Sequence, residues 1–368
     1  MPGLRTFHVS SEHFVELEAL PDELPVEGFV WLSCDRQQFA GEHARLQAQV
    51  QRWTGAQLVD LHVSDLVNEH LPSHYDDTSW YDLLVFRRLA ATPAASADTG
   101  APAPTQERLR RLLQSVDTRA VGFAVFDRLL LTVHPDECAV RDYFAQRLAA
   151  QTVVADLRGN SRLPSTPADL MLRMVNHMVD SYLELRRLLA RELAQLQTEL
   201  LDPRRRFDDW PVVLEARNAL HLLEDTCEDQ RSAVQEWLDT LEEWPEPAGD
   251  DARRERELLR VRSRDVLEHI ERVLSHVRRL EHSAETAVQM HFSALGHRTN
   301  EIMRTLTVLT AVFLPLNLIT GFFGMNFDSL PLIHSGVGIW IALAVMAVVA
   351  LSLVVLFRRK RFLGATRR

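Results

Sequence analysis

The sequence predicts an α+β domain built on a mixed α/β sheet, followed by a very long helix and two C-terminal helices that could cross a membrane. Three observations support this. Apolar runs typical of strands occur in the first part, Pro and Gly are nearly absent over a long later stretch, and two uncharged apolar stretches lie near the C-terminus. With 368 residues, the chain can form a sizeable soluble core besides the membrane segments.

The first segment, residues 1–160, is predicted to be a cytoplasmic α/β domain. Phe39–Trp53 has helical spacing, whereas Ala91–Thr105 is rich in Ala, Pro and Thr and predicts a flexible loop. No basic segment followed by an apolar run opens the sequence, so we expect no cleaved signal peptide. Four short apolar runs suit sheet strands: Gly28–Leu32, Tyr81–Leu89, Ala120–Phe126 and Arg128–Val133.

Residues 161–249 are predicted to form an antiparallel helix pair. Thr166 followed by Pro167 offers an N-cap with Pro at the first helical position, and this helix should run to about Leu201. A second helix is expected from about Pro211 to Glu243.

Residues 250–303 are predicted to form a stalk helix. No Pro occurs between Asp250 and Pro315, and Gly296 is the only Gly in that stretch, so one nearly continuous helix should reach about Gly321. At ~1.5 Å per residue, this helix is roughly 105–110 Å long. Apolar residues recur at steps of four and three, which predicts a seam for a neighbouring copy or helix. They are Val266, Ile270, Val273, Val277, Leu280, Ala284 and Ala287.

Two membrane spans are predicted at residues 304–327 and 337–357, joined by a loop at 328–336. Each contains an uncharged stretch that at ~1.5 Å per residue can cross a ~30 Å hydrocarbon core. The tail, residues 358–368, is basic, whereas the loop has no Lys or Arg. The positive-inside rule therefore puts both termini in the cytoplasm and the loop outside, in a two-span protein of the inner or plasma membrane.

The formal charge of −10 arises in the soluble part, because the tail is basic. The acidic residues form either solvated helix faces or a sink that concentrates cations near a pore, and nucleic acid is not an expected partner. Cys34, Cys138 and Cys227 lie far apart, which fits a reducing compartment and argues against a thiolate metal site. No nucleophile–base pair or Gly-rich phosphate loop is evident, so we expect neither an enzyme nor an organic cofactor.

The first span ends in Gly321-Phe322-Phe323-Gly324-Met325-Asn326-Phe327. This Gly-Met-Asn motif resembles that of the CorA family of divalent metal (Mg²⁺/Co²⁺) transporters, within the CorA/ZntB-like superfamily. The resemblance is strong over about Asp265–Leu363 and is only architectural over the first 160 residues. It implies a homopentameric funnel in the lipid bilayer, with the first span lining the pore. It also implies passive Mg²⁺ influx gated by cytoplasmic Mg²⁺.

Gly324, Met325 and Asn326 are the predicted selectivity filter. Mg²⁺ holds its waters tightly, and a ring of neutral amide oxygens can accept hydrogen bonds from those waters without trapping the ion. Gly324 would let the backbones approach closely. The alternative role of Asn326 is a C-cap, which is compatible with a filter. Asp328 matches an acid that the family has at the outer mouth.

The pore-lining face is predicted by counting back from the filter in steps of three and four. Asn317, an amide within the apolar stretch, faces either a water path or an interhelical hydrogen bond. The resemblance implies a hydrophobic constriction at Met303 and Leu306, for which ordinary packing is the alternative. It places Asn300 at the inner mouth. The face comprises Asn300, Met303, Leu306, Thr310, Leu314, Asn317 and Gly321.

Asp265 matches the family's acidic position on the stalk, which implies a regulatory Mg²⁺ held between subunits, with a partner acid from the α/β domain. The alternative is a solvated helix carboxylate. The stalk histidines have no i, i+4 pair, so we interpret them as solvated or seam residues rather than zinc ligands. They are His269, His276, His282, His291 and His297.

Two rival functions are open at this point. One keeps the architecture and changes the cargo to Zn²⁺ or Ni²⁺, as in ZntB-type transporters, with or without proton coupling. The other is a membrane-anchored sensor that conducts no ion, which leaves Gly324, Asn326 and Asn317 without a role.

Overall fold

The computed structural model describes residues 4–91, 103–136, 138–155, 163–202, 207, 209–245, 249–325 and 337–359. The chain divides into two compact units. Unit 1 comprises residues up to Glu199 together with Arg205–Glu285, and unit 2 comprises Leu200–Arg204 with Thr286 onward.

Unit 1 contains a seven-stranded sheet of order β2-β1-β3-β9-β8-β5-β4. Neighbouring strands are antiparallel except the central pair β3 and β9, which is parallel. A short ladder joins β6 and β7. The strands are β1 Leu4–Val9, β2 Phe14–Leu17, β3 Phe29–Asp35, β4 His74–Asp77, β5 Asp82–Arg87, β6 Ala90–Ala91, β7 Val116–Asp117, β8 Ala120–Val125 and β9 Leu129–His134.

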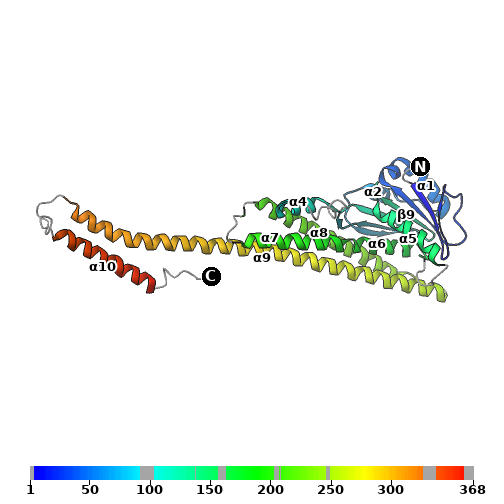
Figure 1. Cartoon of the computed structure of the whole chain (residues 1–368). Coiled ribbons are helices and arrows are strands. Elements are labelled where there is room, and N and C mark those ends of the chain that lie inside the picture. The colour runs from blue at the N-terminus through cyan, green and yellow to red at the C-terminus, as the bar shows by residue number, and fades with distance from the viewer. Residues whose placement is uncertain are drawn as a thin grey trace. The chain divides into compact units, whose positions relative to one another are not determined.

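Helices cover both faces of this sheet (Figure 1). On one face lie α1 (Arg36–Thr54) and α2 (Asp60–Val67). On the other lie α5 (Ala139–Ala155), α6 (Pro167–Asp180) and part of α8 (Trp210–Glu243). Every residue of β8 and β9 is therefore buried, which is why these strands are mostly apolar rather than alternating between apolar and polar residues.

One glycine sets how closely α2 approaches the sheet. A Cβ added to Gly122 of β8 would lie 2.4 Å from Leu66 Cδ2 of α2, closer than any real contact of that kind. The absence of a side chain at this position therefore lets Leu66 fill the core beneath α2.

Beside the sheet, unit 1 forms a helical bundle. It consists of α4 (Thr105–Gln114), α7 (Tyr182–Leu201), α8 and the first part of α9 (Asp250–Phe323). Polar contacts join these helices. Arg108 of α4 pairs with Glu192 of α7 at 2.9 Å, and Trp237 Nε1 of α8 donates to Ser263 Oγ of α9 at 2.9 Å.

The apolar stripe predicted on the stalk packs within the same chain over its first half. Val266, Ile270 and Val277 are buried in unit 1. Of the two predicted partners, a neighbouring copy or a helix, the chain's own helices cover this part of the stripe.

The predicted helix boundaries are partly right. The N-cap is confirmed, since Thr166 accepts a hydrogen bond from the Asp169 N–H. The single helix predicted from there to Leu201 is instead two helices, α6 and α7, which are separated only at Ser181. Ser181 keeps helical backbone angles, and its N–H donates to the His177 carbonyl at 3.0 Å. The Ser181 hydroxyl lies 2.6 Å from the Met178 carbonyl and 3.1 Å from the Leu89 carbonyl, a contact outside the helix.

The predicted loop Ala91–Thr105 lies mostly outside the described residues, and its last residue begins α4. The long helix is confirmed as α9, and the second predicted helix of the pair as α8.

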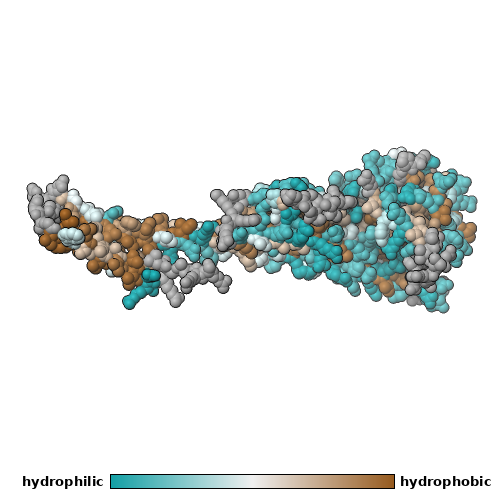
Figure 2. Space-filling model, in the orientation of Figure 1, coloured by the Kyte–Doolittle hydropathy of each residue, from teal (hydrophilic) through white to brown (hydrophobic). Residues whose placement is uncertain are grey.

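Unit 2 contains the rest of α9 and α10 (Gly338–Arg359). Both helices are long and apolar enough to cross a membrane. Only 6% of the most apolar window of α9 and 0% of that of α10 is buried, so neither is the buried core helix of a soluble fold. Figure 2 shows hydrophobic residues over the surface of this unit.

Candidate ion pathway

The predicted pore residues lie on one face of α9. They follow one another at steps of three and four, which places them along one side of a helix. All are exposed in the single chain, and exposure alone does not separate a pore face from a lipid face. They are Asn300, Met303, Leu306, Thr310, Leu314, Asn317 and Gly321.

This face is polar or small toward its outer end and apolar at its inner end, where Met303 and Leu306 lie. The Thr310 hydroxyl donates to the Leu306 carbonyl at 2.9 Å, so its hydrogen-bonding requirement is met inside the helix. Among the residues that the structure describes, the Asn317 side chain makes no such hydrogen bond, and the bond from the Thr320 hydroxyl goes to the Asn317 backbone carbonyl. An amide in an apolar span needs a neighbouring chain or water.

The backbone tightens just after α9. The Gly324 N–H donates to the Thr320 carbonyl at 2.9 Å, and the Met325 N–H donates to the Phe322 carbonyl at 3.4 Å. A Cβ at Gly324 would lie 3.0 Å from the Thr320 oxygen, so a side chain would crowd this turn. Two predicted residues, Asn326 and Asp328, lie outside the described residues, so the complete filter stays a prediction.

Asp265 lies in unit 1, at a cavity of about 260 Å³ between α5, α6 and α9. Its carboxylate is exposed and lies 3.8 Å from His269 Nε2, and His269 Nδ1 lies 3.3 Å from Asp180. The imidazole therefore lies between two acids. Asp180 belongs to the end of α6 of the same chain. The partner acid expected from the α/β domain of a neighbouring subunit therefore stays a prediction.

The stalk histidines within the described residues do not gather at a common site. His276 is buried against Tyr182, with 3.2 Å between Nδ1 and the hydroxyl oxygen, and burial lowers the pKa of His276 to about 4. His291 is buried and hydrogen-bonds the Leu200 carbonyl. His282 and His297 are exposed.

Sequence reasoning missed a cluster that joins α8 to α9. His221 and Glu224 of α8 face Glu281 of α9, and their potential ligand atoms all lie within 4.8 Å of one another. Burial raises the pKa of Glu281, with Glu224 adding to the rise and His221 opposing it. The i, i+3 spacing of His221 and Glu224 was the available signal, but the third residue is distant in sequence.

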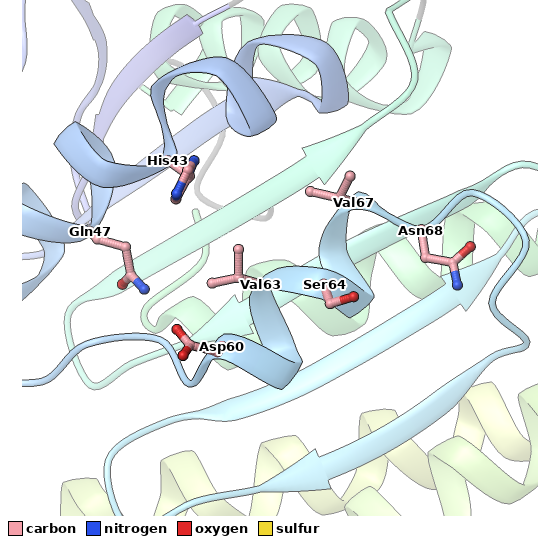
Figure 3. Close-up of a pocket in the computed structure, with 7 residues that line it drawn as sticks. All are labelled: His43, Gln47, Asp60, Val63, Ser64, Val67 and Asn68. Carbon is pink, nitrogen blue, oxygen red and sulfur yellow. The ribbon is translucent and has the colours of Figure 1, made fainter.

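Polar side chains in a groove between α1 and α2 bond to nearby backbone (Figure 3). The groove encloses about 510 Å³. Gln47 uses both ends of its amide on the backbone of Leu58, at 2.8 Å each. His43 hydrogen-bonds the Ala40 carbonyl of its own helix. These polar side chains support local structure.

Comparison with known proteins decides the family. The model of the CorA-like Mg²⁺ transporter protein family matches residues 26–359. The chain belongs to this family. CorA-like proteins are transporters, so the two apolar helices are membrane spans and the chain is not an enzyme.

Curated CorA relatives match only in part. The cobalt/magnesium transport protein CorA of Thermotoga maritima is 34% identical over 100 residues, which are 27% of this chain and 28% of the relative. The Methanocaldococcus jannaschii protein of the same name is 42% identical over 62 residues, or 17% of this chain and 20% of the relative. These matches thus span less than a third of each relative's length.

The fold of this chain matches solved structures over nearly its whole length. The complete CorA magnesium transporter of Methanocaldococcus jannaschii superposes with a TM-score of 0.70 at 18% identity, covering 97% of both chains. The full-length CmaX protein superposes with a TM-score of 0.55 at 19% identity, covering 98% of both. The predicted fold class is confirmed.

Proposed function

We propose that this CorA-family chain is a passive channel that admits Mg²⁺, with Co²⁺ as a second cargo. The observation that carries the proposal is the polar and small-residue outer end of this face of α9. Asn317 has no side-chain partner among the described residues, and Gly321 and Gly324 follow it in sequence toward Asn326. A water-filled path on this face satisfies the amide, and the motif places a second amide at its outer end.

The pore requires several copies, because one helix face cannot enclose a path. A homopentamer would bring five copies of this face around one axis, with α9 lining the pore and α10 outside it. The ring of Asn326 amides would bind the hydrated ion and release it, since neutral oxygens hold Mg²⁺ less tightly than carboxylates do. Asp328 would raise the local cation concentration at the mouth.

Orientation follows from the basic residues after α10. They favour a cytoplasmic C-terminus, and the even number of spans leaves unit 1 in the cytoplasm as well. This arrangement in the inner or plasma membrane exposes Asp265 to cytoplasmic Mg²⁺. Regulatory Mg²⁺ at Asp265 would link neighbouring subunits and favour the closed oligomer. The soluble acidic surface supports cation attraction rather than nucleic-acid binding.

Uptake into liposomes tests the proposal. Purified full-length protein should carry Mg²⁺ inward along a membrane potential without a pH gradient, and Co²⁺ should compete more strongly than Zn²⁺ or Ni²⁺. Dominant Zn²⁺ or Ni²⁺ flux, or flux that needs a proton gradient, would favour the ZntB-like alternative. Absence of flux for every metal would favour a membrane-anchored sensor.

A further inference from the structure

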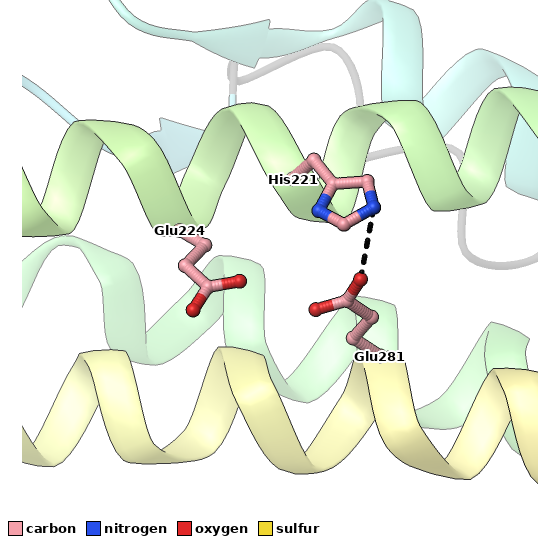
Figure 4. Close-up of side chains that lie close together, drawn as sticks. All are labelled: His221, Glu224 and Glu281. Carbon is pink, nitrogen blue, oxygen red and sulfur yellow. Dashed lines mark ion pairs between the residues drawn. The ribbon is translucent and has the colours of Figure 1, made fainter.

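The cluster between α8 and α9 contains no residue of the predicted pore face (Figure 4), since Glu281 precedes that face on α9. His221 Nε2 lies 3.0 Å from Glu281 Oε1 across the two helices. Glu224, one turn from His221 on α8, lies beside the same space. All three belong to unit 1.

The cluster is accessible yet partly shielded. The His221 side chain is 46% exposed, whereas Glu224 and Glu281 are 20% and 15% exposed. An ion can therefore enter past the imidazole. It would then contact two carboxylates that are themselves largely shielded from water. Two carboxylates this close repel each other, and a cation between them removes that repulsion.

The surrounding residues hold the acids in place. Arg278 donates to Glu224 Oε1 at 2.6 Å and also pairs with Glu228. A carboxylate has lone pairs on both oxygens, so Glu224 Oε2 can bind an ion while Oε1 keeps its arginine. Such an outer partner orients a metal ligand.

We propose that His221, Glu224 and Glu281 form a site for a transition-metal ion of the Zn²⁺ or Co²⁺ type within each subunit. One imidazole and two carboxylates supply three protein ligands, with water in the fourth position. The potential ligand atoms lie within 4.8 Å of one another, so small side-chain rotations would let all three bind a single ion. Mg²⁺ prefers six oxygens, so the imidazole selects against it.

The site joins α8 to the stalk. A bound ion would fix the register of α9 against α8. The chain would thereby respond to a cytoplasmic transition metal at a place separate from Asp265. This inference does not depend on which ion the pore carries.

Metal titration of the full-length protein in detergent tests the site. Excess Mg²⁺ is kept present to fill oxygen-only sites, and Co²⁺ is added while its visible absorption is followed. The wild-type protein should show the intense bands of four- or five-coordinate Co²⁺, which Zn²⁺ should displace. His221→Ala and Glu281→Gln should lower the apparent affinity at least about 100-fold, more than loss of an outer partner costs.

The matched control is His282→Ala, which removes an exposed histidine next to Glu281 on the same helix. It should bind Co²⁺ like the wild type. Size-exclusion chromatography checks that each variant assembles. If Glu281→Gln fails to assemble, His221→Ala alone tests the metal site, because His221 lies at the surface. Asn326→Ala should keep the bands, which separates this site from the pore. Equal Co²⁺ binding by wild type and His221→Ala, or no bands in the wild type, would overturn the proposal.

Discussion

The indole Nε1 of Trp237 donates to the Ser263 hydroxyl oxygen across 2.9 Å, which ties α8 to the stalk helix α9. Trp237 is 1% exposed and Ser263 0%. The serine hydroxyl in turn donates to the Leu259 carbonyl at 2.9 Å. An indole N–H can only donate, so its burial requires this acceptor. The stalk is thus fixed to its own subunit through a satisfied polar contact.

Ser263→Ala should lower stability by about 1–3 kcal/mol, because it leaves the buried Trp237 N–H without its acceptor. The thermal unfolding midpoint of the full-length protein in detergent measures the effect. Ser283→Ala is the control, since Ser283 accepts a bond from Gln197 at the exposed surface of the same helix. Equal midpoints for the two variants would contradict this account.

Acid should destabilise unit 1 through His134. Its Nδ1 contacts the Pro135 carbonyl at 2.8 Å, which leaves Nε2 to accept from the Ser33 hydroxyl at 2.8 Å. The neutral ring therefore suits both partners. Burial lowers the pKa of His134 from 6.5 to about 4. Between pH 6.5 and about 4, His134 is protonated in the unfolded chain but neutral in the folded one. The free energy of unfolding therefore falls as the pH falls, by up to about 3 kcal/mol in all.

Unfolding midpoints measured from pH 7 to pH 5 check this dependence. His134→Gln removes the titrating group and should flatten the profile, although His276 contributes a similar slope over the same range. The exposed His282→Gln should leave the profile as in the wild type. A profile that is equally steep in His134→Gln would contradict the assignment.

The sequence predicted those features that depend on local pattern. The near absence of Pro and Gly predicted α9, and Thr166 before Pro167 predicted the start of α6. The separation of α6 and α7 at Ser181 was not predicted. The Ser181 hydroxyl contacts the Leu89 carbonyl, on a distant segment that no local pattern reveals. Burial of the stalk stripe in its own chain likewise depends on how the helices pack.

The candidate sites divide in the same way. The pore face follows from helical periodicity, because Asn317 and Gly321 keep the spacing of one helix side. The cluster of His221, Glu224 and Glu281 could not be predicted, since it exists only when α8 and α9 lie in one particular register. The partner acid proposed for Asp265 would come from another subunit, so it depends on an assembly that one chain does not define.

Asn326→Ala should abolish Mg²⁺ uptake while leaving expression and assembly intact. The variant removes the proposed ring of amide oxygens for the hydrated ion, whereas alanine is small and uncharged and adds nothing that would disturb assembly. Liposome uptake normalised to assembled protein measures the effect. Flux like that of the wild type would refute the filter assignment and leave Asn326 as a helix cap.

Asp265→Asn should weaken inhibition by internal Mg²⁺. If a regulatory ion binds at Asp265, it stabilises the closed oligomer, and losing the charge should raise the internal Mg²⁺ needed for closure by about 5-fold or more. Mg²⁺-dependent protection of the stalk from protease should fall in parallel. Glu268→Gln, an exposed acid one turn away, is the control. Unchanged protection would contradict the regulatory role and indicate that Asp265 is a solvated helix carboxylate.

The gate is predicted at Met303 and Leu306, which lie about one turn apart on the face shared with Asn317. Both are large, apolar and exposed in the single chain. A ring of such side chains narrows the path and excludes water, so it blocks a hydrated ion without any charge. A small tilt or rotation of α9 would then suffice to open it.

Met303→Ala and Leu306→Ser should therefore leak Mg²⁺ even when internal Mg²⁺ is high, because smaller or polar side chains wet the constriction. Ile302→Ala, a neighbouring exposed apolar residue outside the spacing of the pore face, should behave like the wild type. If these residues only pack the span, the substitutions should instead lower the amount of assembled protein and reduce flux. Uptake per assembled oligomer separates the two, and a drop in that normalised flux would rule out the gate.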